Sequence, residues 1–475
     1  MQIYIVQDGQ PRGPYDIESV KTLLRDGSVV LTDNAWHEGI SDWKPLADIL
    51  GIPPLPPSIS FPPIPAGISS HPSKPPNKYL RVSLIACVLI GLIMIVAVTF
   101  VVAFARSKHP LTEQDLWERS ANQGNAYAQC RLGLMYLDGR GVAKDTGKAI
   151  EWFQKAAAQG DAAAQGNLGI MYAEGRGVLE DDAKAVEWFQ KSADQGYAGP
   201  QNLLGVMYAE GRGVAKDERK AVEWYQKAAA QGNADAQGNL GFMYANGRGI
   251  LKDDEKAVEW FQKAVEQGIA SAQCNLGLMY ANGRGVPKDE AKAVELYQKS
   301  AAQGYPNAQV CLGVTYAVGR GVPRDEVKAF EWFQKAAAQG NAVAQFNLGV
   351  AYDTSRGVLK DDAKAARWYQ KAADQGYAVA EGELGGMYAA GRGVAKNDGK
   401  AFEWLQKAAD QGNANAEVGL GIMYANGRGT LEDEAKAIDW LKKSAAQGNA
   451  DAIAALKSGN IKAYTNQFWE RHEDK

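Results

Sequence analysis

The sequence is poor in histidine and cysteine, and this scarcity excludes several classes of protein. The 475 residues include four His and four Cys, too few for a disulfide scaffold or a His-rich metal centre. No His lies between residues 110 and 471, so catalysis by a Ser-His or Cys-His pair is excluded there. We therefore expect no cofactor, no bound metal and no enzymatic activity.

The chain also lacks a large net charge. Its 52 Lys and Arg residues nearly balance 55 Asp and Glu residues, giving a formal net charge of −3, which argues against a nucleic-acid-binding protein. Proline is scarce except between residues 53 and 76, which hold ten of the 18. The composition therefore divides the chain into a small N-terminal domain, a proline-rich linker, an apolar segment and a long repetitive region.

A period of 36 residues dominates the second part of the chain. A glycine recurs at this spacing from Gly124 to Gly448 and defines nine full units, the pattern of a repeat architecture. In the first unit, Leu132 and Tyr136 share one helix face, a Gly-Arg-Gly triplet ends that helix, and Asp145 is placed to cap a second helix. Because one helix pair cannot bury its apolar face alone, we expect the pairs to stack into a solenoid.

The unit pattern AxxxLGxMYxxGxGVxxDxxKAxxWxxKAAxQG resembles the Sel-one-like repeats, relatives of the tetratricopeptide family, over residues 112–458. The resemblance implies a mainly α fold: a right-handed α-solenoid of helix-turn-helix repeats over 111–458, followed by a C-terminal tail at 459–475. Acidic pairs such as Asp181 and Asp182 are interpreted as helix caps, and the Gly-Arg-Gly triplets as turns. Neither pattern predicts catalysis or phosphate binding.

Binding of other proteins is the remaining function for the repeats. On the first helix, positions equivalent to 131 and 134 vary among the copies, whereas the packing positions do not. The first column is rich in Asn and the second is apolar, which would suit an extended peptide. In related solenoids this helix lines the concave surface, and the resemblance implies the same here. The alternative is that the second column packs against the neighbouring unit. The candidate groove residues are Asn167, Asn239, Phe242, Asn275, Leu278, Asn347 and Glu383.

The first 51 residues predict a small α+β domain. They resemble the bacterial variety of GYF-like domain, with Gly-Pro-Tyr followed by a helix and then the pattern WxEGxxxWxPL. The resemblance implies binding of proline-rich peptides, for which the candidates are Tyr4, Tyr15, Trp36 and Trp43; the alternative is that these aromatic residues form the domain core. The linker at 52–78 favours an extended polyproline spacer, with an intramolecular ligand for this domain as the alternative.

An uncharged apolar run lies within residues 79–106. Its 24 residues at Val82–Ala105 reach about 36 Å as a helix, which predicts a transmembrane helix. Ser83, Cys87 and Gly91 form a small-xxx-small line that favours a homodimer through this helix. Positive charges flank the run equally, three on each side. A folded N-terminal domain without a signal peptide favours a cytoplasmic N-terminus, which would place the repeats in the periplasm or outside the cell.

Together these features predict a single-pass protein of the bacterial inner membrane that acts as a scaffold or adaptor. Its partners would be proteins or peptides bound in the groove of the solenoid, and not nucleic acids. One alternative is a structural or self-associating spacer without a defined ligand. Another is a β-lactamase-like hydrolase, which cysteine-rich relatives suggest, although this chain lacks their paired cysteines.

Overall fold

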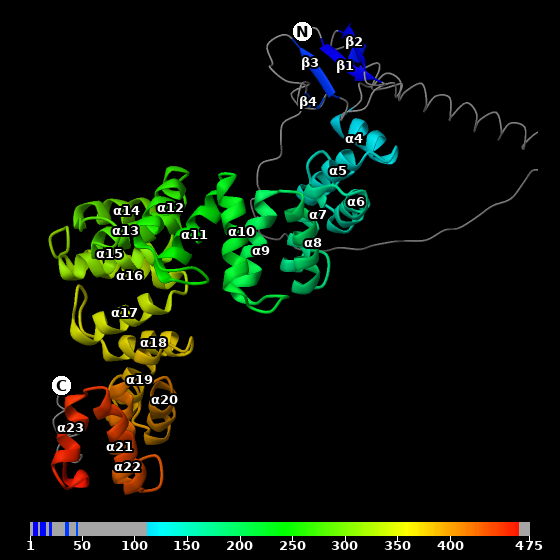
Figure 1. Cartoon of the computed structure of the whole chain (residues 1–475). Coiled ribbons are helices and arrows are strands. Elements are labelled where there is room, and N and C mark those ends of the chain that lie inside the picture. Colours follow the sequence, from blue (N-terminus) through cyan, green and yellow to red (C-terminus); the bar gives the residue numbers. More distant parts are fainter. Residues whose placement is uncertain are drawn as a thin grey trace, which may run out of the picture. The chain divides into compact units, whose positions relative to one another are not determined.

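The structure is a computed structural model in which two compact units, Met1–Asp217 and Glu218–Lys475, are described separately. The residues that it describes are 3–7, 10–15, 19–20, 34–37, 44–45 and 112–464. The predicted linker at 52–78 lies outside them. Figure 1 shows the strands and the successive helices of both units.

A four-stranded antiparallel sheet forms the described part of the N-terminal region. The strand order is β2-β1-β3-β4. The strands are β1 (Ile3–Gln7), β2 (Gln10–Tyr15), β3 (Asn34–His37) and β4 (Lys44–Pro45). Ile3 and Ile5 alternate along β1 and are both fully buried, as expected for one face of a half-buried strand. The predicted strands at the start of the chain are therefore present.

The repeats form helix pairs, nearly all with 13 residues in each helix. The first unit contains α4 (Glu113–Asn122), α5 (Ala126–Asp138), α6 (Thr146–Ala158), α7 (Ala162–Glu174), α8 (Asp182–Asp194) and α9 (Ala198–Glu210). The second unit contains α10 (Glu218–Ala230), α11 (Ala234–Asn246), α12 (Asp254–Glu266), α13 (Ala270–Asn282), α14 (Glu290–Ala302), α15 (Pro306–Val318), α16 (Glu326–Ala338), α17 (Ala342–Thr354), α18 (Asp362–Ala373), α19 (Ala378–Ala390), α20 (Asp398–Asp410), α21 (Ala414–Asn426), α22 (Glu434–Ala446) and α23 (Ala450–Lys457).

Side-chain caps and glycines fix the ends of these helices. Asn233 Oδ1 accepts a hydrogen bond from the first turn of α11, and Asp253 Oδ1 does the same for α12, so each cap satisfies a backbone donor that the helix leaves unpaired. Gly247 ends α11 in the left-handed conformation, with φ of 65°. Gly249, two residues later, is also required to be glycine, because a Cβ atom there would lie 2.1 Å from the carbonyl oxygen of Glu218.

The core of each repeat lies between its two helices. In the pair α11 and α12, Leu240 and Phe261 are buried, and the ring of Phe261 packs against Gly241, where a Cβ atom would come within 2.7 Å of it. The glycine therefore lets the two helices approach closely. The predicted apolar faces of both helices are confirmed in this respect, and so is the α-solenoid of repeated helix pairs.

The tryptophan of the second helix differs from the rest of its predicted apolar stripe. Trp152 is half-buried, and Lys155 Nζ lies 3.9 Å from its ring centroid, a cation–π contact. In the fifth repeat Leu296 replaces this tryptophan, and Lys299 instead forms an ion pair with Glu295, with an N–O distance of 2.7 Å. The lysine thus pairs with a carboxylate four residues away where the aromatic ring is missing.

The prediction of a transmembrane helix needs correction. Among the described residues, no helix is long and apolar enough to cross a membrane. The helices of the repeats have at most 13 residues, or about 20 Å, against a hydrocarbon core of about 30 Å. The predicted span at 79–106 lies outside the described residues. The fold is therefore given as an α-solenoid with a small N-terminal sheet, and the single-pass inner-membrane location and the homodimer through that helix are withdrawn.

Candidate functional site

The first helices of neighbouring repeats lie beside one another in the second unit. Helix α11 contacts α13, α13 contacts α15, and α19 contacts α21. This arrangement brings the two variable columns of successive repeats onto one surface. We call this surface the groove face; it comprises the positions equivalent to 131 and 134 on the first helices.

The predicted residues of the apolar column are accessible on the groove face of the central repeats. Phe242 and Leu278 are each 39% exposed, and Val314 in the next repeat is 42% exposed. Ile422 in the ninth repeat is fully buried, and Leu134 and Val350 are half-buried against the core, so packing explains part of this column. The central repeats therefore present a row of accessible apolar side chains.

The predicted asparagines are half-buried beside this row. Asn167 and Asn347 each donate a side-chain N–H to the carbonyl oxygen four residues earlier, at 2.9 and 2.8 Å. Asn239 and Asn275 are half-buried as well. One N–H of each of these two amides is thus engaged within its helix, and the side-chain oxygen can accept a hydrogen bond from a bound backbone N–H.

Two of the candidates line small cavities between repeats. Leu278 borders a cavity of about 180 Å³ together with Val310, Cys311 and Val314. Asn347 borders one of about 60 Å³ beside Phe330. Both depressions lie beside residues of the groove face.

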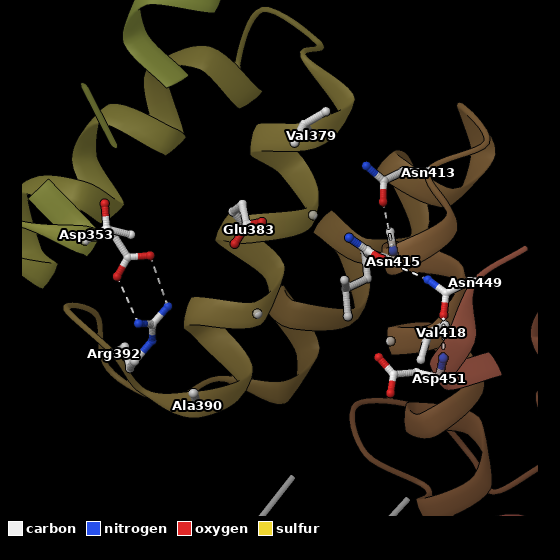
Figure 2. A pocket seen from close by; sticks show the side chains of 16 residues that line it. Asp353, Val379, Glu383, Ala390, Arg392, Asn413, Asn415, Val418, Asn449 and Asp451 are labelled. Carbon is white, nitrogen blue, oxygen red and sulfur yellow. Dashed lines mark hydrogen bonds and ion pairs between the residues drawn. The ribbon is translucent and has the colours of Figure 1, made fainter. Parts of the chain in front are cut away.

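A much larger cavity of about 440 Å³ opens between the seventh and ninth repeats, and Glu383 lines it (Figure 2). Glycines stand at three of its wall positions: Gly382, Gly386 and Gly419. In the preceding repeat the position equivalent to Gly386 holds Val350. The cavity exists because side chains that fill the groove face elsewhere are missing here.

The glycines at two of these positions are not required by packing. A Cβ atom on Gly386 would meet no atom within 4 Å, and one on Gly382 would make only ordinary contacts from 3.7 Å. A glycine inside a helix costs about 1 kcal/mol relative to alanine. Packing therefore does not explain these two glycines, and their lack of side chains leaves space in the cavity.

An ion pair absent from the other described repeats borders the cavity. Arg392 Nη1 lies 2.9 Å from Asp353 Oδ1, and Nη2 lies 3.4 Å from Oδ2 (Figure 2). Asp353 occupies a position that holds alanine in the two flanking repeats. The equivalent Arg428 instead pairs with Asp398 at 2.8 Å, on the second helix of the preceding repeat. Asp353 thus redirects the arginine towards the cavity.

The electrostatic environment of the cavity is negative. Its lining includes Asp353, Glu383 and Asp451 against the single guanidinium of Arg392. Partial desolvation by the surrounding protein raises the pKa of the Glu383 carboxyl above its ordinary value. The negative charge of Asp353 raises this pKa further, and the positive charge of Arg392 lowers it. Within the described residues, no three His, Cys, Asp or Glu side chains are grouped so as to hold a metal ion.

The sequence predicted Glu383 as a site residue but gave no indication that Asp353, Arg392 and Asp451 lie near it. A signal was present, because Asp353 and Gly386 both break columns that are otherwise apolar in all the repeats. What the sequence did not reveal is that these breaks meet in space. Asp353 and Arg392 are 39 residues apart and come together only through the stacking of repeats.

The candidates in the N-terminal domain are only partly described. Tyr15 is half-buried at the end of β2. The backbone of Tyr4 in β1 pairs with that of Trp36 in β3, while their side chains and the whole of Trp43 lie outside the described residues. Peptide binding by these four residues stays a prediction.

Comparisons with known proteins identify both parts of the chain. Residues 4–51 match the family described as GYF domain 2. The family described as Sel1 repeat matches nine times, at residues 126–161, 162–197, 201–233, 234–269, 270–305, 306–341, 342–377, 378–413 and 414–449. No match was found among curated proteins.

Two solved structures resemble the chain over most of its length. The protective antigen c5321 of uropathogenic Escherichia coli is 38% identical, with a TM-score of 0.55, covering 74% of this chain and 76% of that one. A Sel1 repeat protein from Oxalobacter formigenes is 34% identical, with a TM-score of 0.48, covering 69% and 93%. The chain therefore belongs to the Sel1 repeat family, and it carries an N-terminal region that matches GYF domain 2.

Proposed function

We propose that this protein is a non-catalytic scaffold that binds segments of partner proteins along its groove face. Solenoids of the Sel1 and tetratricopeptide type suggest protein-interaction scaffolds, because stacked helix pairs expose a long continuous surface. The observation that carries the proposal is the accessible row of Phe242, Leu278 and Val314 beside the asparagine column.

The chemistry of the groove face suits an extended peptide. Apolar side chains of the peptide would enter the depressions beside Leu278 and Asn347, and its backbone N–H groups would donate to the asparagine oxygens. Regular spacing of equivalent positions from one repeat to the next would then match the regular spacing of an extended chain. Affinity would come mainly from the apolar contacts, and the asparagines would set the register.

A comparison of two triple variants tests this proposal. The first, Asn239→Ala, Asn275→Ala and Asn347→Ala, removes the amides of the groove face and places good helix formers at helical positions. Proteins captured by the full-length chain and by the variant would be quantified by mass spectrometry. We expect partners of the unaltered chain to be depleted with the variant.

A matched control removes three amides from the second helices. Gln226, Gln262 and Gln334 are exposed, so Gln226→Ala, Gln262→Ala and Gln334→Ala change the same chemical group outside the groove face. This control is expected to retain the partners. If the groove variant retains every partner as well, the proposal is wrong and the solenoid serves as a spacer.

A further inference from the structure

We propose that the cavity between the seventh and ninth repeats receives the cationic side chain, arginine or lysine, of a bound partner segment. This inference rests on the proposed function, because it names the residue type that the groove face selects at one point. The cavity lies on α19 and α21 and is lined by Glu383 of the asparagine-rich column. It would therefore be met by the same peptide that runs along the first helices.

The cavity has room for a long side chain. The cavity of about 440 Å³ falls within the range of about 300–1,000 Å³ typical of ligand sites. Gly386 keeps it open although a Cβ atom there would touch nothing. The equivalent positions in the two preceding repeats, Val314 and Val350, would fill part of this volume. A long side chain can thus enter here and not at the neighbouring repeats.

The lining of the cavity carries more negative than positive charge. Asp353 and Arg392 form an ion pair in the lining of the cavity, which leaves the carboxylates of Glu383 and Asp451 as its remaining charges. Asp353 also makes the ionised form of Glu383 less favourable. A cation entering the cavity would relieve this repulsion, whereas an acidic side chain would add to it. An apolar side chain would displace water from the exposed Glu383 carboxylate without replacing its hydrogen bonds.

The asparagines of the wall are already engaged in hydrogen bonds. Asn413 and Asn449 accept hydrogen bonds from the backbone at the starts of α21 and α23. Asn449 also donates to Asn415 Oδ1 at 2.9 Å. Figure 2 shows these interactions, and it shows none that joins Glu383 to the other lining residues drawn. Glu383 and Asp451 are therefore the carboxylates that this cavity presents to a ligand.

Selection from a random nine-residue peptide library displayed on phage tests the inference. The bait is the full-length chain, and peptides selected by the unaltered protein are expected to share an arginine or lysine at one position. A selected peptide would then be synthesised twice, with arginine or with its neutral isostere citrulline at that position. We expect citrulline to weaken binding about ten-fold or more, because a charge-assisted hydrogen bond is lost.

Three variants localise the effect. Gly386→Val restores the residue of the preceding repeats and fills the cavity, and Glu383→Gln removes the charge at nearly constant shape; both are expected to abolish the difference between the arginine and citrulline peptides. Gly386→Ala is the control, because one methyl group leaves most of the space open. Circular dichroism would verify that each variant retains its helix content.

The outcomes separate this inference from the proposed function. Peptides that depend on Asn239, Asn275 and Asn347 but show no preference for a basic residue would overturn the inference alone. A basic preference that survives both Gly386→Val and Glu383→Gln would also overturn it, since the cation would then bind elsewhere. If no peptide is selected at all, the inference and the proposed function both fail.

Discussion

Glu381 and Glu417 interrupt a chain of amide hydrogen bonds, and their replacement by glutamine is expected to stabilise the solenoid. The seven earlier repeats have glutamine at this position. In one of them, Gln237 Nε2 donates to the Ala229 carbonyl at 3.3 Å, while its Oε1 accepts from Gln267 at 2.8 Å. Glu381 is only 3% exposed and accepts from Gln411 at 2.7 Å, but an ionised carboxylate has no hydrogen to donate.

The magnitude follows from the missing donor. One net hydrogen bond contributes about 0.5–1.5 kcal/mol, so Glu381→Gln should raise the free energy of unfolding by about 1 kcal/mol near pH 8. Burial raises the pKa of Glu381 in the folded protein, above an unfolded value of about 4.3. Protonation therefore stabilises the folded state fully below about pH 4.3, and this benefit is lost as the pH rises through the folded pKa. The gain from the substitution should accordingly shrink as the pH falls.

Hydrogen exchange read by mass spectrometry measures this effect locally. Exchange of the α19 and α20 amides should slow by about five-fold at pH 8 in Glu381→Gln, and the urea midpoint of the full chain should rise. Because repeats contact only their neighbours, helices of the first unit should be unaffected. The converse substitution Gln237→Glu is the matched control and should destabilise α11 and α12 by a similar amount.

Two results would contradict this prediction. If Glu381→Gln leaves the exchange of α19 and α20 unchanged or faster at pH 8, the hydrogen-bond account of this position is wrong. A gain that is the same at pH 5 and pH 8 would contradict the assignment of the effect to ionisation of Glu381.

Three further predictions concern other positions. Gly285→Ala should lower the free energy of unfolding by more than about 2 kcal/mol in urea unfolding, because the new Cβ atom would lie 2.2 Å from a backbone oxygen of α12. The control Gly268→Ala also has a positive φ, but its Cβ atom would meet no atom within 4 Å, so it should cost only about 1 kcal/mol. Ser355→Gly should raise the urea midpoint and increase the free energy of unfolding by up to about 1 kcal/mol, because Ser355 has φ of 58°, where glycine carries no Cβ penalty. A lower midpoint would mean that the hydrogen bond from Ser355 to the Val358 carbonyl matters more. Iodoacetamide should modify Cys311 before Cys274, as followed by mass spectrometry. Cys311 is half-buried and a hydrogen bond with Cys274 lowers its thiol pKa, whereas that hydrogen bond and burial raise the pKa of Cys274. The reverse order would refute this.

The repeat architecture was predictable because it depends on local patterns. The spacing of Leu132 and Tyr136 predicts the buried face of the first helix, and both are buried. Asp145 was expected to cap the second helix, and its Oδ1 accepts from Lys148 N at 3.0 Å. Such features need only the residues within one turn of the helix, so the sequence alone is sufficient to locate them.

Features that depend on stacking were not predictable. The pairing of Arg392 with Asp353 requires knowledge of which turns meet between repeats. Another such contact lies near the end of the chain: Ile461, in the predicted tail, is buried with Val418 and Ile422. A partial final repeat lacks the motif of the others, although it still covers the exposed face of the last full one.

The central claim, that the groove face binds partner proteins, is tested most directly by photo-crosslinking from within it. Benzoylphenylalanine would replace Phe242 or Leu278 on the groove face, and Trp260 on the second helix as the control, in the full-length chain in bacterial cells. We expect specific crosslinked proteins from Phe242 and Leu278 that are absent from Trp260. Equal crosslinking from all three positions, or crosslinking from Trp260 alone, would contradict the account.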